Sequence, residues 1–182
     1  MRKSDEILRA LIYKVRKSGH EIVIPNFYFG KWEMDLFRLL NTGYLSEYEV
    51  KTSRADFRKD FKKQTHDIKY NINNPSGKRF VKENFQNKHE QIRAGNYPAN
   101  KFFFVVPAGM VKPDEVPDYA GLIYYISDEW GGRFETIKPG KFIHKNKPEI
   151  DLEQICKSLC YREFNQRMKN LNLTNKIKNL TK

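Results

Sequence analysis

The 182-residue sequence has little cysteine, no long apolar run and a shortage of acidic side chains. Its two cysteines, Cys156 and Cys160, are too few for the disulfide framework of a small secreted protein. No second Cys or His pair completes a tetrahedral zinc site with them, so we expect buried, reduced thiols on a helix. The apolar run Phe102–Val106 has only five residues, against the roughly 18 of a membrane span. The amino-terminal pattern is that of a polar amphipathic helix rather than a signal peptide, and we therefore expect a cytoplasmic protein.

Basic side chains outnumber acidic ones by a wide margin. The chain has 34 Lys and Arg against 22 Asp and Glu, which gives a net charge of +12. Six basic residues lie within 51–63 and seven within 157–182. A charged run is often only a solvated face, but this excess also suits a polyanion and favours nucleic acid as the partner.

The hydrophobic patterns predict alternating helices and strands. The length suggests a single domain, expected over residues 1–169 and followed by a basic, frayed tail over 170–182. The predicted order of helices and strands indicates an α/β domain with a central sheet flanked by helices. We expect this sheet to be mixed, because an antiparallel hairpin is followed by a strand added in parallel. In chain order we expect a helix over 4–19, a β-rich stretch over 20–29 that either breaks at Pro25-Asn26 or is an edge strand, a hairpin over 32–51, a helix over 54–70, a loop over 71–78, a helix over 80–94, strands over 102–106, 122–127 and 133–137, and a helix over 150–168.

The hairpin over residues 32–51 carries the clearest chemical signal. Two alternating runs flank Asn41-Thr42-Gly43, where the glycine suits a left-handed turn position. If the turn centres on Thr42, Asp35 lies directly opposite Glu49, and opposed like charges destabilise a sheet. A divalent cation between the two carboxylates would remove that repulsion. Lys51 lies two residues beyond Glu49 and therefore on the same face, so the patch is a candidate metal-dependent hydrolytic site.

An acid two residues before a lysine is a weak signal by itself. The same spacing occurs at Asp60-Phe61-Lys62 and Asp67-Ile68-Lys69, in a charge-mixed run that is typical of a solvated helix. Only Glu49-Val50-Lys51 ends a β-prone run and has an acidic partner on a neighbouring strand. The alternative is a surface face with a cross-strand ion pair between Glu33 and Lys51, and the residues alone leave both interpretations open.

The chain resembles the PD-(D/E)XK nuclease superfamily in its element order and in the succession of Asp35 and Glu49-Val50-Lys51 on neighbouring strands. Three stretches are similar in more detail to the MmcB-like DNA repair family and related phage proteins: PNFYFGKWEMDLF, EYEVKTSRADF and NKFFFVVPAGMVKPDEVPDYAGLIYY. In those relatives the helix after the motif leads directly to a Lys-His pair, which here is Lys88-His89. The resemblance therefore implies an insertion in this chain, expected to be mobile, around residues 64–84.

The resemblance also implies a restriction-endonuclease-like core with a metal-dependent phosphodiesterase site. Asp35 and Glu49 match the two metal carboxylates, the backbone carbonyl of Val50 adds a ligand, and Lys51 is the lysine of the motif. Hard oxygen ligands favour Mg²⁺ or Mn²⁺. The metal would lower the pKa of a bound water, while Lys51 orients or deprotonates that water and stabilises negative charge on the scissile phosphate.

Five further residues are secondary candidates. Arg54 and Lys62 are expected to contact DNA phosphates. Glu6 is either an additional metal ligand or a partner of the helix dipole, and we favour the dipole. Glu47 is either a spare ligand or an exposed strand residue. His89 matches the family pair, but we expect an exposed helix residue.

Three functions remain in competition at this point. The leading hypothesis is a DNA endonuclease-like phosphodiesterase of repair or recombination that uses neither a membrane nor a small-molecule cofactor, with a homodimer left open. The alternative is a catalytically inactive nucleic-acid-binding module that keeps the nuclease fold, and the third is a protein-interaction domain for an acidic partner. Four aromatic residues could stack on bases, although packing is the favoured use: Trp32, Trp130, Tyr124 and Tyr125.

Overall fold

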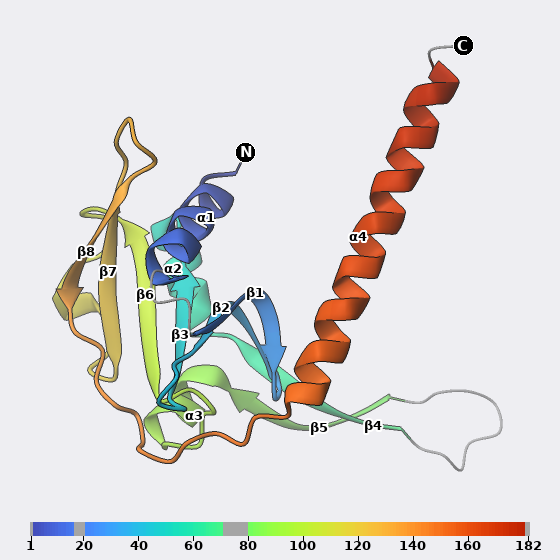
Figure 1. The fold of residues 1–182 in the computed structure, drawn as a ribbon. Coiled ribbons are helices and arrows are strands. Elements are labelled where there is room, and N and C mark those ends of the chain that lie inside the picture. The colour runs from blue at the N-terminus through green and yellow to red at the C-terminus, as the bar shows by residue number, and fades with distance from the viewer. Residues whose placement is uncertain (1, 17–20, 71–79, 181–182) are drawn as a thin grey trace. The chain divides into compact units, whose positions relative to one another are not determined.

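The computed structural model of the chain describes residues 2–16, 21–70 and 80–180. Residues 1–148 form one compact unit and residues 149–182 form a second (Figure 1). This division differs from the expected single domain over 1–169, because the residues from 152 onward belong to one long helix that is a unit of its own.

A six-stranded mixed sheet lies at the centre of the first unit, with its strands in the order β1-β2-β3-β6-β7-β8. The first three strands are antiparallel, β3, β6 and β7 are parallel, and β8 is antiparallel to β7. The predicted α/β fold with a mixed central sheet is confirmed. The elements of this unit are α1 (Lys3–Val15), β1 (Ile22–Phe29), β2 (Trp32–Leu39), β3 (Leu45–Val50), α2 (Arg54–Asp60), β4 (Gln64–Tyr70), β5 (Phe80–Asn87), α3 (Lys88–Arg93), β6 (Lys101–Pro107), the 3-10 turn η2 (Pro113–Glu115), β7 (Ala120–Ile126) and β8 (Arg133–Lys138).

The hairpin of β2 and β3 has the predicted register. Leu36 pairs with Tyr48 and Leu39 with Leu45, which centres the turn on Thr42. Gly43 has a φ of +82°, a left-handed conformation that glycine adopts without strain. One step beyond the Leu36–Tyr48 pair, this register sets Asp35 opposite Glu49.

Strand β1 is the edge strand that Pro25 predicts. Pro25 pairs with Leu36 and Phe27 with Met34, so Asn26 faces Asp35 without a regular ladder pair of its own. Asn26 has a φ of +47°, which asparagine tolerates better than most residues. The backbone is therefore irregular at the point where β1 passes Asp35.

Helices cover both faces of the sheet. On one face, Ile7, Leu11 and Val15 of α1 pack in a core cluster with Tyr48, Val50 and Val105. On the other face, the Phe57 ring of α2 lies 4.9 Å from the Phe104 ring of β6. Phe104 and Val105 both have 0% exposure, which confirms that β6 is buried on both faces. Because side chains alternate along β3, Glu47 and Glu49 face α2 and α3, whereas Tyr48 and Val50 face α1.

Residues 64–70 and 80–87 are strands, β4 and β5, rather than parts of the predicted helices. They form a separate antiparallel pair, so the charge-mixed pattern was interpreted with the wrong period. The Lys88 N–H donates to the Lys63 carbonyl at 3.0 Å, and the pair therefore leaves and rejoins the domain at one place. The expected insertion thus begins as a hairpin arm, while the loop expected over 71–78 lies outside the described residues.

The second unit is a single helix, α4 (Leu152–Leu180). It continues through residues 170–180, where the sequence analysis expects a frayed tail, because no glycine or proline interrupts it. Cys156 and Cys160 are free and exposed, so their predicted burial is wrong. In the described part of the chain, every helix is too short or too polar to cross a membrane.

Candidate metal and nucleic-acid site

The three predicted catalytic residues converge at the carboxyl end of β3. The Asp35 Oδ2 atom accepts a hydrogen bond from the Val50 N–H at 2.8 Å. Within an extended strand the N–H and C=O of one residue point towards the same neighbouring strand, so the Val50 carbonyl is directed towards β2 and Asp35 as well. The Lys51 Nζ atom lies 2.9 Å from Glu49 Oε2. The candidate ligands Asp35, Glu49 and Val50 therefore lie near Lys51 at the carboxyl end of β3.

Glu49 is fully buried among three lysines. Its Oε1 atom accepts from Lys63 Nζ at 2.8 Å and from Lys88 Nζ, and its Oε2 atom accepts from Lys51 Nζ. Burial alone would raise the pKa of Glu49, but the charges of Lys88, Lys51 and Lys63 outweigh it and hold the pKa well below its ordinary value. Glu49 is therefore an ionised carboxylate, and its Oε2 atom keeps one lone pair beyond the bond from Lys51.

Lys51 is a buried cation between two carboxylates. Its Nζ atom lies 2.9 Å from Glu49 Oε2 and 2.7 Å from Asp60 Oδ1. Burial disfavours the charge, yet these carboxylates outweigh it and raise the pKa of Lys51 above its usual value. Lys51 therefore stays protonated near neutral pH and is unsuited to deprotonate a water. It is also only 5% exposed, so the interpretation as a surface ion pair with Glu33 is wrong. The helix predicted around Asp60 is present over residues 54–60, but Asp60 itself is buried, with 1% exposure.

The surroundings of Asp35 disfavour its ionised form. Burial and the negative charge of Glu49 raise the pKa of Asp35 to about 7, although the Lys51 charge and the Val50 N–H oppose this rise. Its Oδ1 atom has no hydrogen-bond partner among the described residues. Asp35 borders a polar pocket of about 270 Å³. The pocket is also lined by Arg2, Ser4, Asp5, Leu8, Asn26, Val50, Lys51 and Asp56.

The candidate donors near Asp35 suit a hard cation with few protein ligands. Asp35 and Val50 line the pocket, whereas Glu49 is not a lining residue and acts on Asp35 through its charge, with the remaining lone pair of its Oε2 atom as the third candidate donor. In the described residues, no group of three or more His, Cys, Asp and Glu side chains could hold a metal ion. Mg²⁺ is commonly held by one or two carboxylates together with waters and substrate phosphates, so two carboxylates are sufficient for it. A cation bound here would also relieve the repulsion that raises the pKa of Asp35.

Glu47, a secondary candidate, is neither exposed nor a member of the Asp35 pocket. It is fully buried, with Oε1 2.5 Å from Lys88 Nζ and Oε2 accepting from the Tyr97 hydroxyl at 2.6 Å. Burial raises the pKa of Glu47 to about 7, and the charge of Lys88 opposes this rise. The Lys88 ammonium therefore bridges the carboxylates of Glu47 and Glu49, and all three side chains have 0% exposure.

His89 is buried rather than exposed, with 2% exposure, so the prediction for this residue is wrong. Its Nε2 atom lies 2.8 Å from Asp60 Oδ2 and its Nδ1 atom lies 2.6 Å from the Tyr119 hydroxyl. A neutral ring with its hydrogen on Nε2 satisfies both contacts, because it donates to Asp60 and accepts from Tyr119. Burial would raise the pKa of Asp60, but the bond from His89 and the charges of nearby lysines lower it to about 2. His89 thus holds the carboxylate that pairs with Lys51.

The remaining predicted residues lie apart from the Asp35 pocket. Lys62 is exposed on the segment after α2. Arg54 donates to the Met110 carbonyl at 2.7 Å and pairs with Glu115, so it fastens the loop after β6. Glu6 accepts from the Tyr125 hydroxyl at 2.7 Å and does not border the Asp35 pocket.

Sequence reasoning missed three partners of this site: the buried Lys88, the buried carboxylate of Asp60 and Lys63, whose side chain is 39% exposed. Lysine and aspartate are almost never fully buried unless they are paired, which places them on the surface by default. A signal was nevertheless present. The alternation that sets Asp35 opposite Glu49 also puts Glu47 on the same sheet face, and three acids on a covered face require cations from elsewhere in the chain.

No protein-family model matches the chain, and neither does any curated protein. Among solved structures, the chain is similar to the SPO1766 protein of unknown function from Silicibacter pomeroyi. The two share 16% sequence identity over 94% of this chain and 92% of that chain, with a TM-score of 0.52. At this identity the likeness supports the α/β fold alone.

Proposed function

We propose that this chain is a metal-dependent phosphodiesterase of the PD-(D/E)XK type that acts on DNA in repair or recombination. The observation that carries the proposal is the state of Asp35. Its pKa is raised to about 7 by burial and by Glu49, and one of its oxygens has no hydrogen-bond partner among the described residues, at a polar pocket beside Val50 and Lys51. Repelled carboxylates at a cleft are typical of a site built for a cation, and raised pKa values cluster at functional sites.

The charged residues at the site have different roles in the proposed reaction. Mg²⁺ or Mn²⁺, when bound, supplies Lewis acidity and an activated water. Asp35 and Glu49 would hold the cation, and Asn26 lines the same pocket as Asp35. Lys51 remains protonated and stabilises the negative charge that develops on the scissile phosphate. The net charge of +12 supports attraction of a polyanionic substrate.

A cleavage screen tests the proposal. The purified chain is incubated with duplex, single-stranded, flapped and branched DNA in Mg²⁺, in Mn²⁺ and in EDTA. We expect cleavage of at least one structure that needs the metal, and its loss in Asp35→Asn. Asp118→Asn is the matched control, because the Asp118 side chain is 95% exposed and lies outside the pocket. Failure to cut any of these substrates, or equal cleavage by Asp35→Asn, would overturn the proposed activity.

A second candidate function is nucleic-acid binding without cleavage, and one observation favours it. Glu49 is already neutralised by Lys51, Lys63 and Lys88, so the fold needs no metal to balance this carboxylate. DNA binding that is identical in EDTA and in Mg²⁺, together with an absence of cleavage, would select this alternative.

A further inference from the structure

The hairpin between β7 and β8 presents an exposed tryptophan. Trp130 is 93% exposed, more than any other large hydrophobic side chain in the described residues, whereas Trp32 is 7% exposed. The expectation that both tryptophans serve packing is therefore wrong for Trp130. The hairpin extends past the end of the sheet on the side of α1 (Figure 1). A large aromatic ring held in solvent contributes nothing to the core, so its presence needs another reason.

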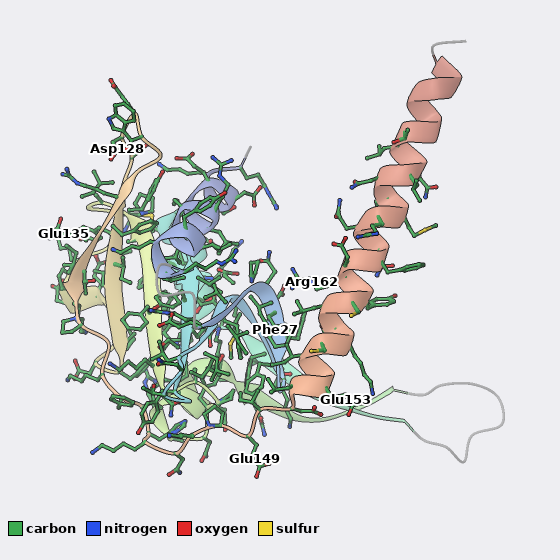
Figure 2. The ribbon with its side chains drawn as sticks, viewed as in Figure 1. Phe27, Asp128, Glu135, Glu149, Glu153 and Arg162 are labelled. Atoms are coloured by element: carbon green, nitrogen blue, oxygen red, sulfur yellow. The ribbon has the colours of Figure 1, made fainter. Side chains whose placement is uncertain are left out.

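The turn that carries Trp130 is firmly held. Asp128, labelled at this hairpin in Figure 2, accepts from the N–H groups of Trp130 at 2.9 Å and Gly132 at 2.8 Å. Gly132 has a φ of +90°, and a Cβ there would meet the Tyr125 ring at 2.3 Å, so glycine is required. The Tyr125 hydroxyl donates to Glu6 of α1 at 2.7 Å, which ties the hairpin to that helix. The exposed ring is thus presented on an ordered support, which lowers the entropy lost when a ligand binds it.

A second aromatic ring and a basic side chain share a hollow with Trp130, which the acidic Glu6 also lines. Tyr13 of α1 is 74% exposed and lines a hollow of about 320 Å³ together with Trp130 and Arg9. An adjoining hollow shares Tyr13 and adds Arg133. Aromatic rings that stack on bases, beside cations that contact phosphates, are the combination by which proteins bind single-stranded nucleic acid. A flat apolar ligand without charge would make no use of Arg9 and Arg133.

Helix α1 lies between these hollows and the Asp35 pocket. Asp5 and Leu8 of α1, with Arg2 directly before the helix, border the Asp35 pocket, and residues Glu6, Arg9 and Tyr13 border the hollow beside Trp130. The two sets recur every three or four residues and therefore form two flanks of the same helix. A helix with its side chains is about 10–12 Å wide, so a strand a few nucleotides long can reach from one hollow to the other.

We propose that Trp130 and Tyr13 form a stacking site for unpaired bases. Its placement beside a cleavage centre rests on the proposed function, and together they specify the substrate class as DNA with a single-stranded segment next to the cleaved bond. Bases inside a duplex are already stacked and paired, and they must be extruded at an energetic cost before they can stack on a side chain. Blunt duplex DNA therefore cannot use this site.

The test compares two DNA forms and three proteins. Dissociation constants of the full chain, Trp130→Ala and Tyr161→Ala are measured by fluorescence anisotropy in EDTA, with a single-stranded oligonucleotide and a blunt duplex of the same length at one salt concentration. Tyr161 of α4 is the matched control, because it is another exposed aromatic residue, with 68% exposure. We expect Trp130→Ala to weaken single-strand binding roughly tenfold and to leave duplex binding unchanged. Single-stranded DNA should also quench the emission of wild-type Trp130, and Tyr161→Ala should behave as the wild type.

The outcomes separate this proposal from the proposed function, because binding in EDTA does not depend on cleavage. A selective loss of single-strand affinity in Trp130→Ala supports the stacking site even in a chain that cuts nothing. Unchanged single-strand affinity, or equal weakening for both DNA forms, overturns the stacking site even if Asp35-dependent cleavage is found. A chain that binds neither DNA form overturns the stacking site and removes the DNA partner from the proposed function.

Discussion

Replacing Asp35 by asparagine should stabilise the protein at alkaline pH, although Asp35 is the proposed metal ligand. The folded chain holds this carboxyl with a pKa of about 7, above the ordinary value of 3.8, because burial and Glu49 disfavour its charge. Ionised Asp35 therefore opposes folding. Asparagine removes the charge while its side-chain oxygen can still accept the hydrogen bond from the Val50 N–H, which Asp35 accepts at 2.8 Å.

The sign and the size of this effect follow from proton linkage. Since the pKa is higher in the folded chain than in the unfolded chain, the penalty is absent below about pH 4, grows with pH and is complete above pH 7. At about 1.4 kcal/mol for each tenfold change in proton affinity, the upper limit is about 4 kcal/mol. Partial exposure of Asp35 lowers the expected gain for Asp35→Asn to on the order of 2 kcal/mol at pH 8.

Urea unfolding followed by circular dichroism, in EDTA at pH 5 and pH 8, measures this gain. We expect the free energy of unfolding of Asp35→Asn to exceed that of the wild type by a larger margin at pH 8 than at pH 5. Asp118→Asn, which alters a carboxylate with 95% exposure, should change the free energy of unfolding by less than about 0.5 kcal/mol at either pH. The reasoning is refuted if Asp35→Asn is the less stable protein at pH 8, or if its advantage does not depend on pH.

Three further predictions concern the buried charges and the activity. Lys88→Met should lower the free energy of unfolding by about 3–5 kcal/mol in urea titrations, because it leaves two buried carboxylates without their shared cation; a second change, Glu47→Gln, should restore part of the loss, and an additive second loss would contradict this account. Tyr119→Phe should lower the free energy of unfolding by about 1 kcal/mol through the lost hydrogen bond to His89, and a neutral effect would show that this bond carries no weight. Any metal-dependent cleavage should rise as pH increases through about 7, where Asp35 ionises, and a rate that falls over that range would exclude Asp35 as a ligand.

The hairpin at the site was predictable because its determinants are local. The alternation of β2 and β3 and the glycine after Thr42 are enough to define a register, and the register sets Asp35 opposite Glu49. The same reasoning failed for β4 and β5. Their strands are stabilised as a pair across an intervening segment, and mixed charge along each run resembles the exposed face of a helix.

The buried ion network was not predictable in the same way. Lys88 lies 41 residues from Glu47 and 39 from Glu49, and nothing in its neighbourhood along the chain marks it as an interior residue. Lys88 is buried because β5 brings the chain back to Lys63, the residue before β4, where the Lys88 N–H donates to the Lys63 carbonyl. Trp130 was misjudged for a similar reason, since exposure at a hairpin tip depends on what the rest of the fold covers.

Calorimetric titration with Mn²⁺ at pH 8 tests the central claim most directly, namely that Asp35 and Glu49 hold one hard cation beside Lys51. The wild-type chain should bind one ion per molecule, and Asp35→Asn should bind none while remaining folded. Absence of binding to the wild type, or equal binding by Asp35→Asn, would contradict the account.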